Sequence, residues 1–140
     1  MREVDSTAAS CIGSLLEMGA GRSASAVAIL APGRAPLTYT GLYAQVRRTM
    51  QALNDRGIGR GDRVALVLPN GPEMAAAFLG VAACATCAPL NPGYRAAELE
   101  FYLGDLGARA LVVPAGSGSP AVAVAHARRI PVLELSPAPD

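Results

Sequence analysis

Residues Gly116–Ser119, with the sequence GSGS, are the first candidates for chemistry because they lie between a predicted strand and a predicted helix. In that position, backbone amides can point at a phosphate group near the start of the helix. The stretch lacks the GxxxxGK[ST] spacing of a phosphate-binding loop, and all twelve basic residues are arginines, so no lysine can contact a phosphate. We therefore interpret Gly116–Ser119 as a flexible loop.

Two cysteines, Cys84 and Cys87, have the spacing of a redox-active pair. A reactive pair needs the N-terminus of a helix, where the helix dipole lowers the pKa of a thiol. This pair instead follows the end of an apolar helical segment, so we expect two buried, reduced cysteines. We expect no zinc site, because the three cysteines and one histidine are scattered from Cys11 to His126.

The remaining titratable candidates are one histidine and two glutamates. His126 lies in an alanine-rich helical segment with no carboxylate three or four residues away, so we expect a surface or half-buried histidine. Glu98 and Glu100 are two residues apart and therefore face different directions on a helix. We interpret both as solvated helix surface rather than as an acid–base pair.

Asn70, Asn91 and Tyr94 lie near the carboxyl ends of predicted strands, where ligands bind in doubly wound folds. Helix capping and turn formation explain each of the three residues without a ligand, and we favour that explanation. The sequence therefore predicts no catalytic, cofactor-binding or metal-binding residue within this chain.

The elements that would position these residues alternate between short apolar runs and helical patterns, as in an α/β domain. The expected strands are Ala26–Leu30, Leu37–Tyr39, Val64–Leu68, Cys87–Leu90, Ala110–Val113 and Val132–Leu135. The expected helices are Ala8–Met18, Thr40–Arg56, Met74–Cys84, a helix around Leu99–Leu106, and Ala121–Arg129.

Several residues predict where these elements begin and end. Thr40 is the expected N-cap of its helix, and Gly57 fits a left-handed helix terminus. Asn70 is expected to cap the next helix, with Glu73 completing a capping box. Pro89 places its strand at a sheet edge or a strand end, because proline cannot donate a hydrogen bond to a neighbouring strand.

The apolar pattern also predicts how the elements pack. Val64–Leu68 is continuously apolar, which indicates burial on both faces of a parallel sheet. Met74–Cys84 is apolar nearly all round, so we expect this helix to be sandwiched, with its small residues close to the sheet. The predicted fold class is α/β, with a mostly parallel sheet of about five strands and helices on both faces.

Composition indicates one domain of ordinary size, since the chain has 140 residues. The hydrophobic fraction of 51% includes only four tyrosines and two phenylalanines, and this predicts tight helix-on-sheet packing rather than a bulky core. A net charge of +1 gives no reason to expect nucleic acid or an anionic membrane as a partner.

No targeting or membrane-spanning segment is predicted, and we expect a cytoplasmic protein. The N-terminal residues MREVDSTAASCIGSLL mix both charges before a short apolar run, unlike a secretory signal. Met74–Tyr94 is uncharged, but prolines interrupt it and leave roughly 17 residues, the lower limit for a membrane span. A buried helix followed by a buried strand explains this segment better.

Three segments occur together in an order typical of one enzyme family: LTYTGLY at 37–43, GDRVALVLPNGPE at 61–73 and LGVAACATCAPLNPGY at 79–94. This order resembles the N-terminal part of the adenylate-forming ligases, which include acyl-CoA synthetases, aryl-CoA ligases and peptide-synthetase adenylation domains. The resemblance extends roughly from Ala24 to Leu135. The stretch NPGYRAAELEFYL looks more like the CoA ligases than the peptide-synthetase domains.

The resemblance implies the N-terminal subdomain of an ATP-dependent acyl-CoA synthetase with a role in fatty acid metabolism. Such enzymes join a carboxylic acid to AMP, release pyrophosphate and pass the acyl group to coenzyme A, with Mg²⁺ shielding the phosphates. The family's phosphate loop, its lysine and its substrate-pocket residues lie downstream of Asp140. We therefore expect a fragment that is inactive alone, with the acid, ATP, Mg²⁺ and CoA bound by the missing regions.

The resemblance also suggests the organisation of the chain. Residues 1–23 would form an N-terminal helix and lead-in, 24–135 the α/β subdomain, and 136–140 a tail or truncation point. An apolar face that a longer ligase would cover could lead this chain to self-associate.

Two alternatives remain from the sequence. The chain could be a non-catalytic binding or structural module that keeps the ligase scaffold. It could also be a complete flavodoxin-like or nucleotide-binding domain, which would need an acidic cluster or glycine-rich loop after the first strand. After AVAIL the chain has APGRAP, which is neither.

Overall fold

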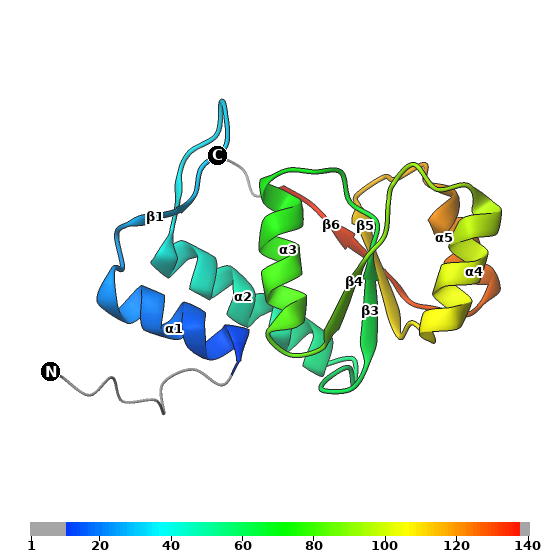
Figure 1. Ribbon diagram of the computed structural model, residues 1–140, viewed down its shortest axis with the longest axis horizontal. Helices are drawn as coiled ribbons and strands as arrows, with labels where there is room; N and C mark the ends of the chain where they lie inside the picture. The colour runs from blue at the N-terminus through cyan, green and yellow to red at the C-terminus, as the bar shows by residue number, and fades with distance from the viewer. Residues whose placement is uncertain (1–10, 138–140) are drawn as a thin grey trace, which may run out of the picture.

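The computed structural model describes residues 11–137 and shows a parallel sheet with helices on both faces, together with a small separate hairpin (Figure 1). The helices are α1 (Ile12–Arg22), α2 (Tyr39–Asn54), α3 (Pro72–Ala82), α4 (Ala96–Leu106) and α5 (Pro120–Ala127). The strands are β1 (Val27–Ile29), β2 (Leu37–Thr38), β3 (Arg63–Leu66), β4 (Thr86–Pro89), β5 (Ala110–Pro114) and β6 (Val132–Leu135). The start of the predicted helix Ala8–Met18 lies outside the described residues.

The four-stranded sheet has the order β4-β3-β5-β6, and all of its strands are parallel. Side chains of central β3 alternate between two cores because successive residues of a strand point to opposite faces. Val64 and Leu66 pack in the core formed with α2 and α3, whereas Ala65 and Val67 pack in the core formed with α4 and α5. The predicted fold class is confirmed, and β4, which carries Pro89, lies at a sheet edge as predicted.

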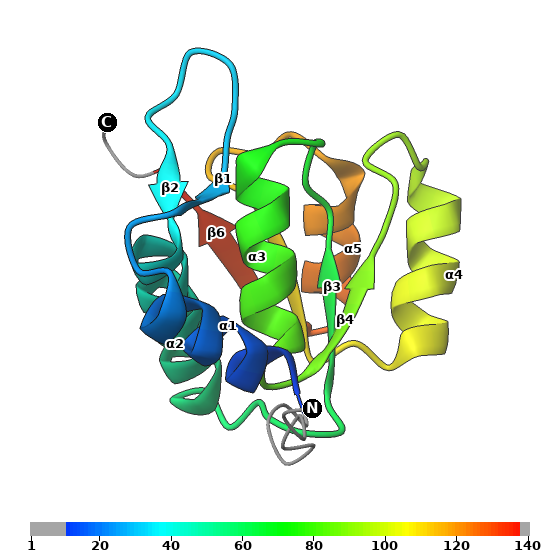
Figure 2. The same cartoon turned by 60° about the vertical axis from the view of Figure 1, so that its left-hand side comes forward.

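The two N-terminal strands do not join this sheet. They pair with each other as an antiparallel hairpin, with Val27 opposite Thr38, and the main sheet therefore has four strands where the sequence predicted about five. Backbone amides of Tyr39 and Thr40 donate to the carbonyls of Ala26 and Ala24, which fixes the hairpin on the N-terminus of α2. Figure 2 shows the hairpin loop standing beyond α2 and α3.

Helix α3 is packed against α1, α2 and the sheet, which confirms the predicted sandwiched position. Ala77 and Val81 are buried in the core beneath it. The closest approach, however, is between helices: a Cβ placed on Gly80 would lie 2.8 Å from the Cβ of Thr49 on α2. Of the small residues that we expected to face the sheet in part, Ala77 packs against β3, whereas Gly80 faces the neighbouring helix α2.

Two predicted helix caps are also corrected. Thr38, not Thr40, caps α2, because its hydroxyl accepts a hydrogen bond from the amide of Gly41 at 3.2 Å. The N-cap of α3 is Gly71 rather than the predicted Asn70; its φ of 155° suits glycine, and no side chain caps that helix. Glu73 is then the second helical residue, not the third that a capping box requires, and its carboxylate pairs with Arg34 of the hairpin loop instead.

The predicted helix terminus at Gly57 is confirmed. Gly57 has a φ of 71°, and the amide of Ile58 donates to the carbonyl of Leu53. Ile58 is buried, so the apolar contact that usually accompanies this terminus is present.

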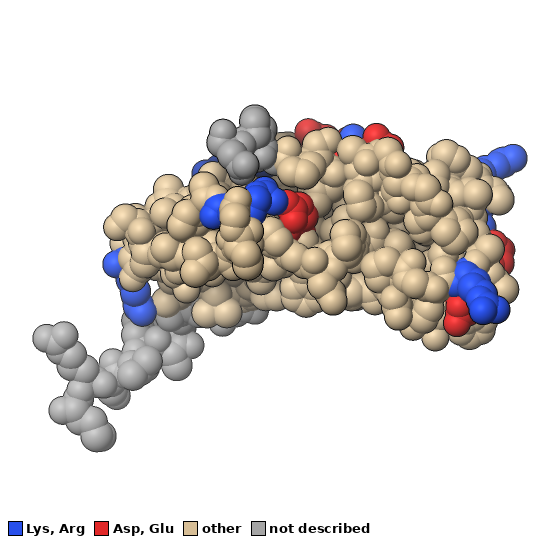
Figure 3. Space-filling model, turned by 90° about the horizontal axis from the view of Figure 1, so that it is seen from above, with Lys and Arg blue, Asp and Glu red and all other residues tan. Residues whose placement is uncertain are grey.

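Charged side chains are sparse on the face formed by the carboxyl ends of the strands. Seen from that side, Figure 3 shows mostly uncharged side chains, with charge confined to a few places. Within residues 11–137, no helix combines the length and the apolar character required to cross a bilayer.

Candidate functional site: an apolar groove at the carboxyl edge of the sheet

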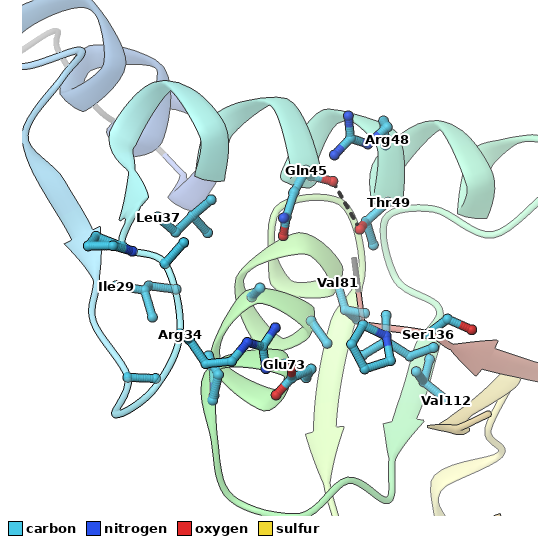
Figure 4. Close-up of a pocket in the computed structure, with 18 residues that line it drawn as sticks. Ile29, Arg34, Leu37, Gln45, Arg48, Thr49, Glu73, Val81, Val112 and Ser136 are labelled. Carbon is cyan, nitrogen blue, oxygen red and sulfur yellow. Dashed lines mark hydrogen bonds and ion pairs between the residues drawn. The ribbon is translucent and has the colours of Figure 1, made fainter. Parts of the chain in front are cut away.

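A groove with a cavity volume of about 480 Å³ lies between the hairpin, α2, α3 and the end of β6 (Figure 4). Its walls are largely apolar and come from segments far apart in the sequence. They include Ile29, Leu37, Ala77, Val81, Val112 and Leu135. The volume falls within the range of small-molecule sites, and the apolar walls suit the burial of aliphatic or aromatic groups.

One ion pair crosses this groove. The guanidinium of Arg34, on the hairpin loop, lies 2.6 Å from the carboxylate of Glu73, in the first turn of α3. The hydrogen bond from Arg34 holds the pKa of Glu73 below its ordinary value. About a third of each side chain is exposed, so the pair ties the hairpin to α3 at the rim rather than in a sealed interior.

Helix α2 supplies the polar wall with Gln45, Arg48 and Thr49. The hydroxyl of Thr49 donates to the carbonyl of Gln45 at 3.1 Å, so it is already used within the helix. Among the described residues, the lining holds no histidine, cysteine or lysine, and it therefore presents no nucleophile paired with a base. The arrangement favours binding or packing rather than covalent chemistry.

The GSGS loop serves the helix that follows it. The hydroxyl of Ser119 accepts from the amide of Ala121, and that of Ser117 accepts from the amide of Ser119, both at 3.1 Å. Ser119 is the N-cap of α5, and Gly116 adopts a φ of 69° that favours glycine. The polar atoms of this loop are thus accounted for by capping and turn formation.

Cys84 and Cys87 are free thiols and are half-buried rather than fully buried. Burial raises the pKa of Cys84 and raises that of Cys87 to about 11. Neither thiol is therefore ionised near neutral pH, which agrees with the prediction of inert, reduced cysteines.

The two glutamates on α4 have separate structural partners. Glu98 accepts a hydrogen bond from the backbone amide of Arg95 at 2.8 Å, which caps the helix. Glu100 forms an ion pair with Arg128 of the α5 terminus at 2.7 Å. His126 is exposed, as predicted. Across residues 11–137, no three His, Cys, Asp or Glu side chains gather into a possible metal site.

Two of the three polar residues near the strand ends, Asn91 and Tyr94, have local structural roles. The side-chain oxygen of Asn91 accepts from the amide of Gly93 at 2.8 Å, which stabilises the turn after β4. The ring of Tyr94 stacks on that of Tyr102, with centroids 5.1 Å apart. Asn70 is exposed in the segment between β3 and α3.

The groove and its ion pair were missed by sequence reasoning. Arg34 and Glu73 are separated by 39 residues, and no local spacing rule links a hairpin loop to a helix in that way. A weak signal was present: Arg34 is the only charged residue of the turn APGRAP, and Glu73 is the only charged residue of its helix.

Comparison with known proteins places this fold in a family. The family model described as AMP-binding enzyme matches residues 5–138, nearly the whole chain. The chain belongs to the AMP-binding enzyme family. Its match corresponds to the N-terminal part of the CoA ligases in that family, as the resemblance predicted.

Three proteins illustrate the similarity. The probable CoA ligase CCL9 of Humulus lupulus is 41% identical over 101 residues, covering 71% of this chain and 19% of the ligase. The oxalate–CoA ligase of Arabidopsis thaliana is 38% identical over 118 residues, covering 83% of this chain and 23% of that protein. A solved Mycobacterium tuberculosis fatty acyl CoA synthetase is 33% identical with a TM-score of 0.72, covering 85% of this chain and 23% of that one.

The chain therefore spans only about a fifth to a quarter of the length of these relatives. The groove lies within the part that they share, since all of its lining residues fall between Ile29 and Pro137.

Proposed function

We propose that this chain is the N-terminal scaffold of an AMP-forming acid–CoA ligase and does not activate acids on its own. The observation that carries the proposal is the family match over residues 5–138, combined with relatives named as CoA ligases of which the chain covers 19% and 23%. The complete enzyme would join a carboxylic acid to AMP with release of pyrophosphate, and then transfer the acyl group to CoA.

We place the ATP, Mg²⁺ and CoA chemistry of the ligase reaction outside this stretch, because residues 11–137 contain no lysine-bearing phosphate loop and no cluster of three possible metal ligands. No group of three or more His, Cys, Asp or Glu side chains that could hold a metal ion occurs in residues 11–137. The hydroxyls of the GSGS loop are used in capping α5, and the chain has no lysine for a phosphate. No catalytic step is therefore assigned to side chains of this chain.

The proposed role is structural support for the catalytic parts. The apolar groove and the sparsely charged carboxyl edge give a surface that further polypeptide of a ligase could cover. The domain limits follow the same proposal, with 1–23 leading into the α/β scaffold of 24–135 and 136–140 leaving it. We also infer a cytoplasmic location, which suits the free thiols of all three cysteines.

The choice of acid is proposed to lie elsewhere in the enzyme. The chain is 38% identical to a ligase named for oxalate and 33% identical to a fatty acyl CoA synthetase. Oxalate is small and doubly charged, whereas a fatty acid is long and apolar, so one pocket could not select both. A shared scaffold with selectivity built from other residues explains both similarities.

The proposal is tested by assaying the purified 140-residue chain for acid-dependent exchange of pyrophosphate into ATP. Acetate, a fatty acid, an aromatic acid and oxalate should each leave the exchange at background, because the chain has no lysine and no loop with the spacing of a phosphate-binding loop. An intact relative, such as the Arabidopsis oxalate–CoA ligase, is the positive control. Clear acid-dependent exchange by the chain alone would show that residues assigned here to the scaffold perform the chemistry.

The alternative of a non-catalytic module is not favoured by a specific observation. The relatives and structural neighbours of the chain are named as CoA ligases or acyl-CoA synthetases, and its sparsely charged edge suits a scaffold within a larger enzyme.

A further inference from the structure

A second hollow, of about 560 Å³, lies at the opposite edge of the sheet, where β5 and β6 begin and α2 and α5 end. Four arginines surround it, and its floor contains the buried side chains of Ile58, Ala108 and Ile130. The arginines are Arg56, Arg109, Arg128 and Arg129. One third of the arginines of the chain therefore meet at one hollow, although the chain as a whole carries a net charge of only +1.

Three of these guanidinium groups are held in place by structural partners. Arg109 pairs with Asp62 at 3.2 Å, and Arg56 donates to the carbonyl of Ala52 at 2.8 Å. Arg128 pairs with Glu100 at 2.7 Å. Because each side chain is anchored, less conformational entropy would be lost when a ligand binds.

Arg128 lies against helix α4. A Cβ added to Gly104 of α4 would lie 2.7–2.8 Å from guanidinium atoms of Arg128. The Glu100 carboxylate pairs with the same guanidinium from the same helix.

The anchoring contacts leave most donors unused. A guanidinium has five N–H donors, and the contacts of Arg56, Arg109 and Arg128 described above use one donor each. Among the described residues that line the hollow, none is acidic. The helix dipole explains an arginine at the end of α2. Arg129 lies beyond the end of α5, and its side chain forms no hydrogen bond or ion pair within residues 11–137.

We propose that this hollow binds a phosphate-bearing ligand with two or more negative charges. Guanidinium groups match phosphate oxygens with paired N–H donors, and several of them around one hollow suit a diphosphate better than a single charge. This inference is independent of the proposed ligase function, since the hollow lies at the edge of the sheet opposite the groove.

The experiment titrates the 140-residue chain separately with inorganic pyrophosphate, ATP and adenosine. Isothermal titration calorimetry at about 50 mM salt measures the binding in each case. Saturable 1:1 binding of pyrophosphate and ATP is expected, with none for adenosine, and the affinity should fall as salt rises because exposed charges are screened. Tighter binding of pyrophosphate would identify a free phosphate anion as the better ligand, and tighter binding of ATP a nucleotide.

The test variant is Arg56→Gln with Arg129→Asn, since asparagine tolerates the φ of 58° found at Arg129. The matched control is Arg22→Gln with Arg47→Gln. It also removes two positive charges, one from α1 and one from the outer side of α2. The test variant should bind pyrophosphate at least fivefold more weakly, whereas the control should bind as the unmodified chain does. Thermal unfolding confirms that both variants are folded.

Two results would overturn the proposal. One is the absence of saturable pyrophosphate binding by the unmodified chain. The other is an equal loss of affinity in the test and control variants, which would mean that the ligand responds only to overall charge.

Discussion

At the scale of single residues, the Arg34–Glu73 pair is the contact that most directly shapes the candidate site. It joins a hairpin loop to the first turn of α3 across a groove that is otherwise apolar. Both side chains are about one-third exposed, so the contribution to stability is that of a partly solvated ion pair. Its larger effect is geometric, because it holds the loop at the rim of the groove.

Replacing Glu73 with glutamine should lower the free energy of unfolding by about 0.5–1 kcal/mol at pH 7. The folded-state pKa of Glu73 is lowered, so this stabilisation is present above the ordinary glutamate value of about 4.3 and is lost as the pH falls through the folded-state pKa. Urea unfolding of both proteins should therefore differ at pH 7 and converge in acid.

The exposed Glu134 of β6 provides a matched control, and Glu134→Gln should leave the pH 7 unfolding curve unchanged. A Glu73→Gln difference that persisted unchanged in acid would contradict a charge-based role for Glu73.

At the scale of elements, the packing of α3 on α2 depends on small residues. Gly80 faces Thr49 so closely that an added Cβ would lie 2.8 Å from the threonine Cβ. The two helices share the core above β3, and this packing forms one wall of the groove. Their separation therefore affects both stability and the shape of the site.

Gly80→Leu should destabilise the fold by about 1–3 kcal/mol, because the added side chain would overlap the Thr49 side chain, which already occupies this space. Thermal or urea unfolding measures the effect. Gly21→Leu is the matched control, since Gly21 is also helical but has nothing within 4 Å of its Cβ position. An unchanged melting temperature for Gly80→Leu would show that α3 does not approach α2 as described.

Most elements could be predicted from the sequence because their signals are local. The continuous apolar run at Val64–Leu68, the glycine at position 57 and the proline at position 89 each specify a local environment that the structure contains. The predictions that were wrong concern residues for which a local partner and a distant partner compete. The cap of α3 lies one residue later than predicted, which takes Glu73 out of capping-box position, and its carboxylate pairs with the distant Arg34.

The candidate site was harder to predict than the fold for the same reason. Its groove is assembled from the hairpin, two helices and the end of β6, and the hairpin pairs with itself instead of joining the sheet. No periodicity in a single sequence reports which loop covers which helix. The family resemblance predicted the fold correctly, but only the structure shows the groove that its elements enclose.

At the scale of the whole molecule, the chain leaves large apolar side chains exposed for a protein of this size. Leu30 on the hairpin loop, Leu15 on α1 and Phe101 on α4 are 73%, 58% and 63% exposed. We predicted that α3 and α4 carry wide apolar faces. Phe78 on α3 and Phe101 on α4 belong to these faces and are 38% and 63% exposed. Surfaces of this kind usually mark an interface.

The isolated chain should therefore bind a hydrophobic dye or self-associate at micromolar concentration. Sedimentation velocity and dye fluorescence test this directly, and Phe101→Ser should reduce either signal without unfolding the protein, since Phe101 lies on the surface. A clean monomer that binds no dye would instead indicate a self-sufficient domain and would favour a binding module.

The central claim is that this chain can act as the scaffold of an acid–CoA ligase, and a chimera measures that most directly. The segment of the Arabidopsis oxalate–CoA ligase that matches this chain is replaced by this chain, and oxalate-dependent pyrophosphate exchange is assayed. A parallel chimera that carries the hop CCL9 segment controls for the tolerance of the host enzyme.

We predict that the chimera with this chain exchanges pyrophosphate with oxalate and retains the acid preference of its host, because the scaffold carries no selectivity. Introducing Gly80→Leu should then abolish or sharply reduce the exchange. A folded chimera that is inactive while the CCL9 chimera is active would contradict the account.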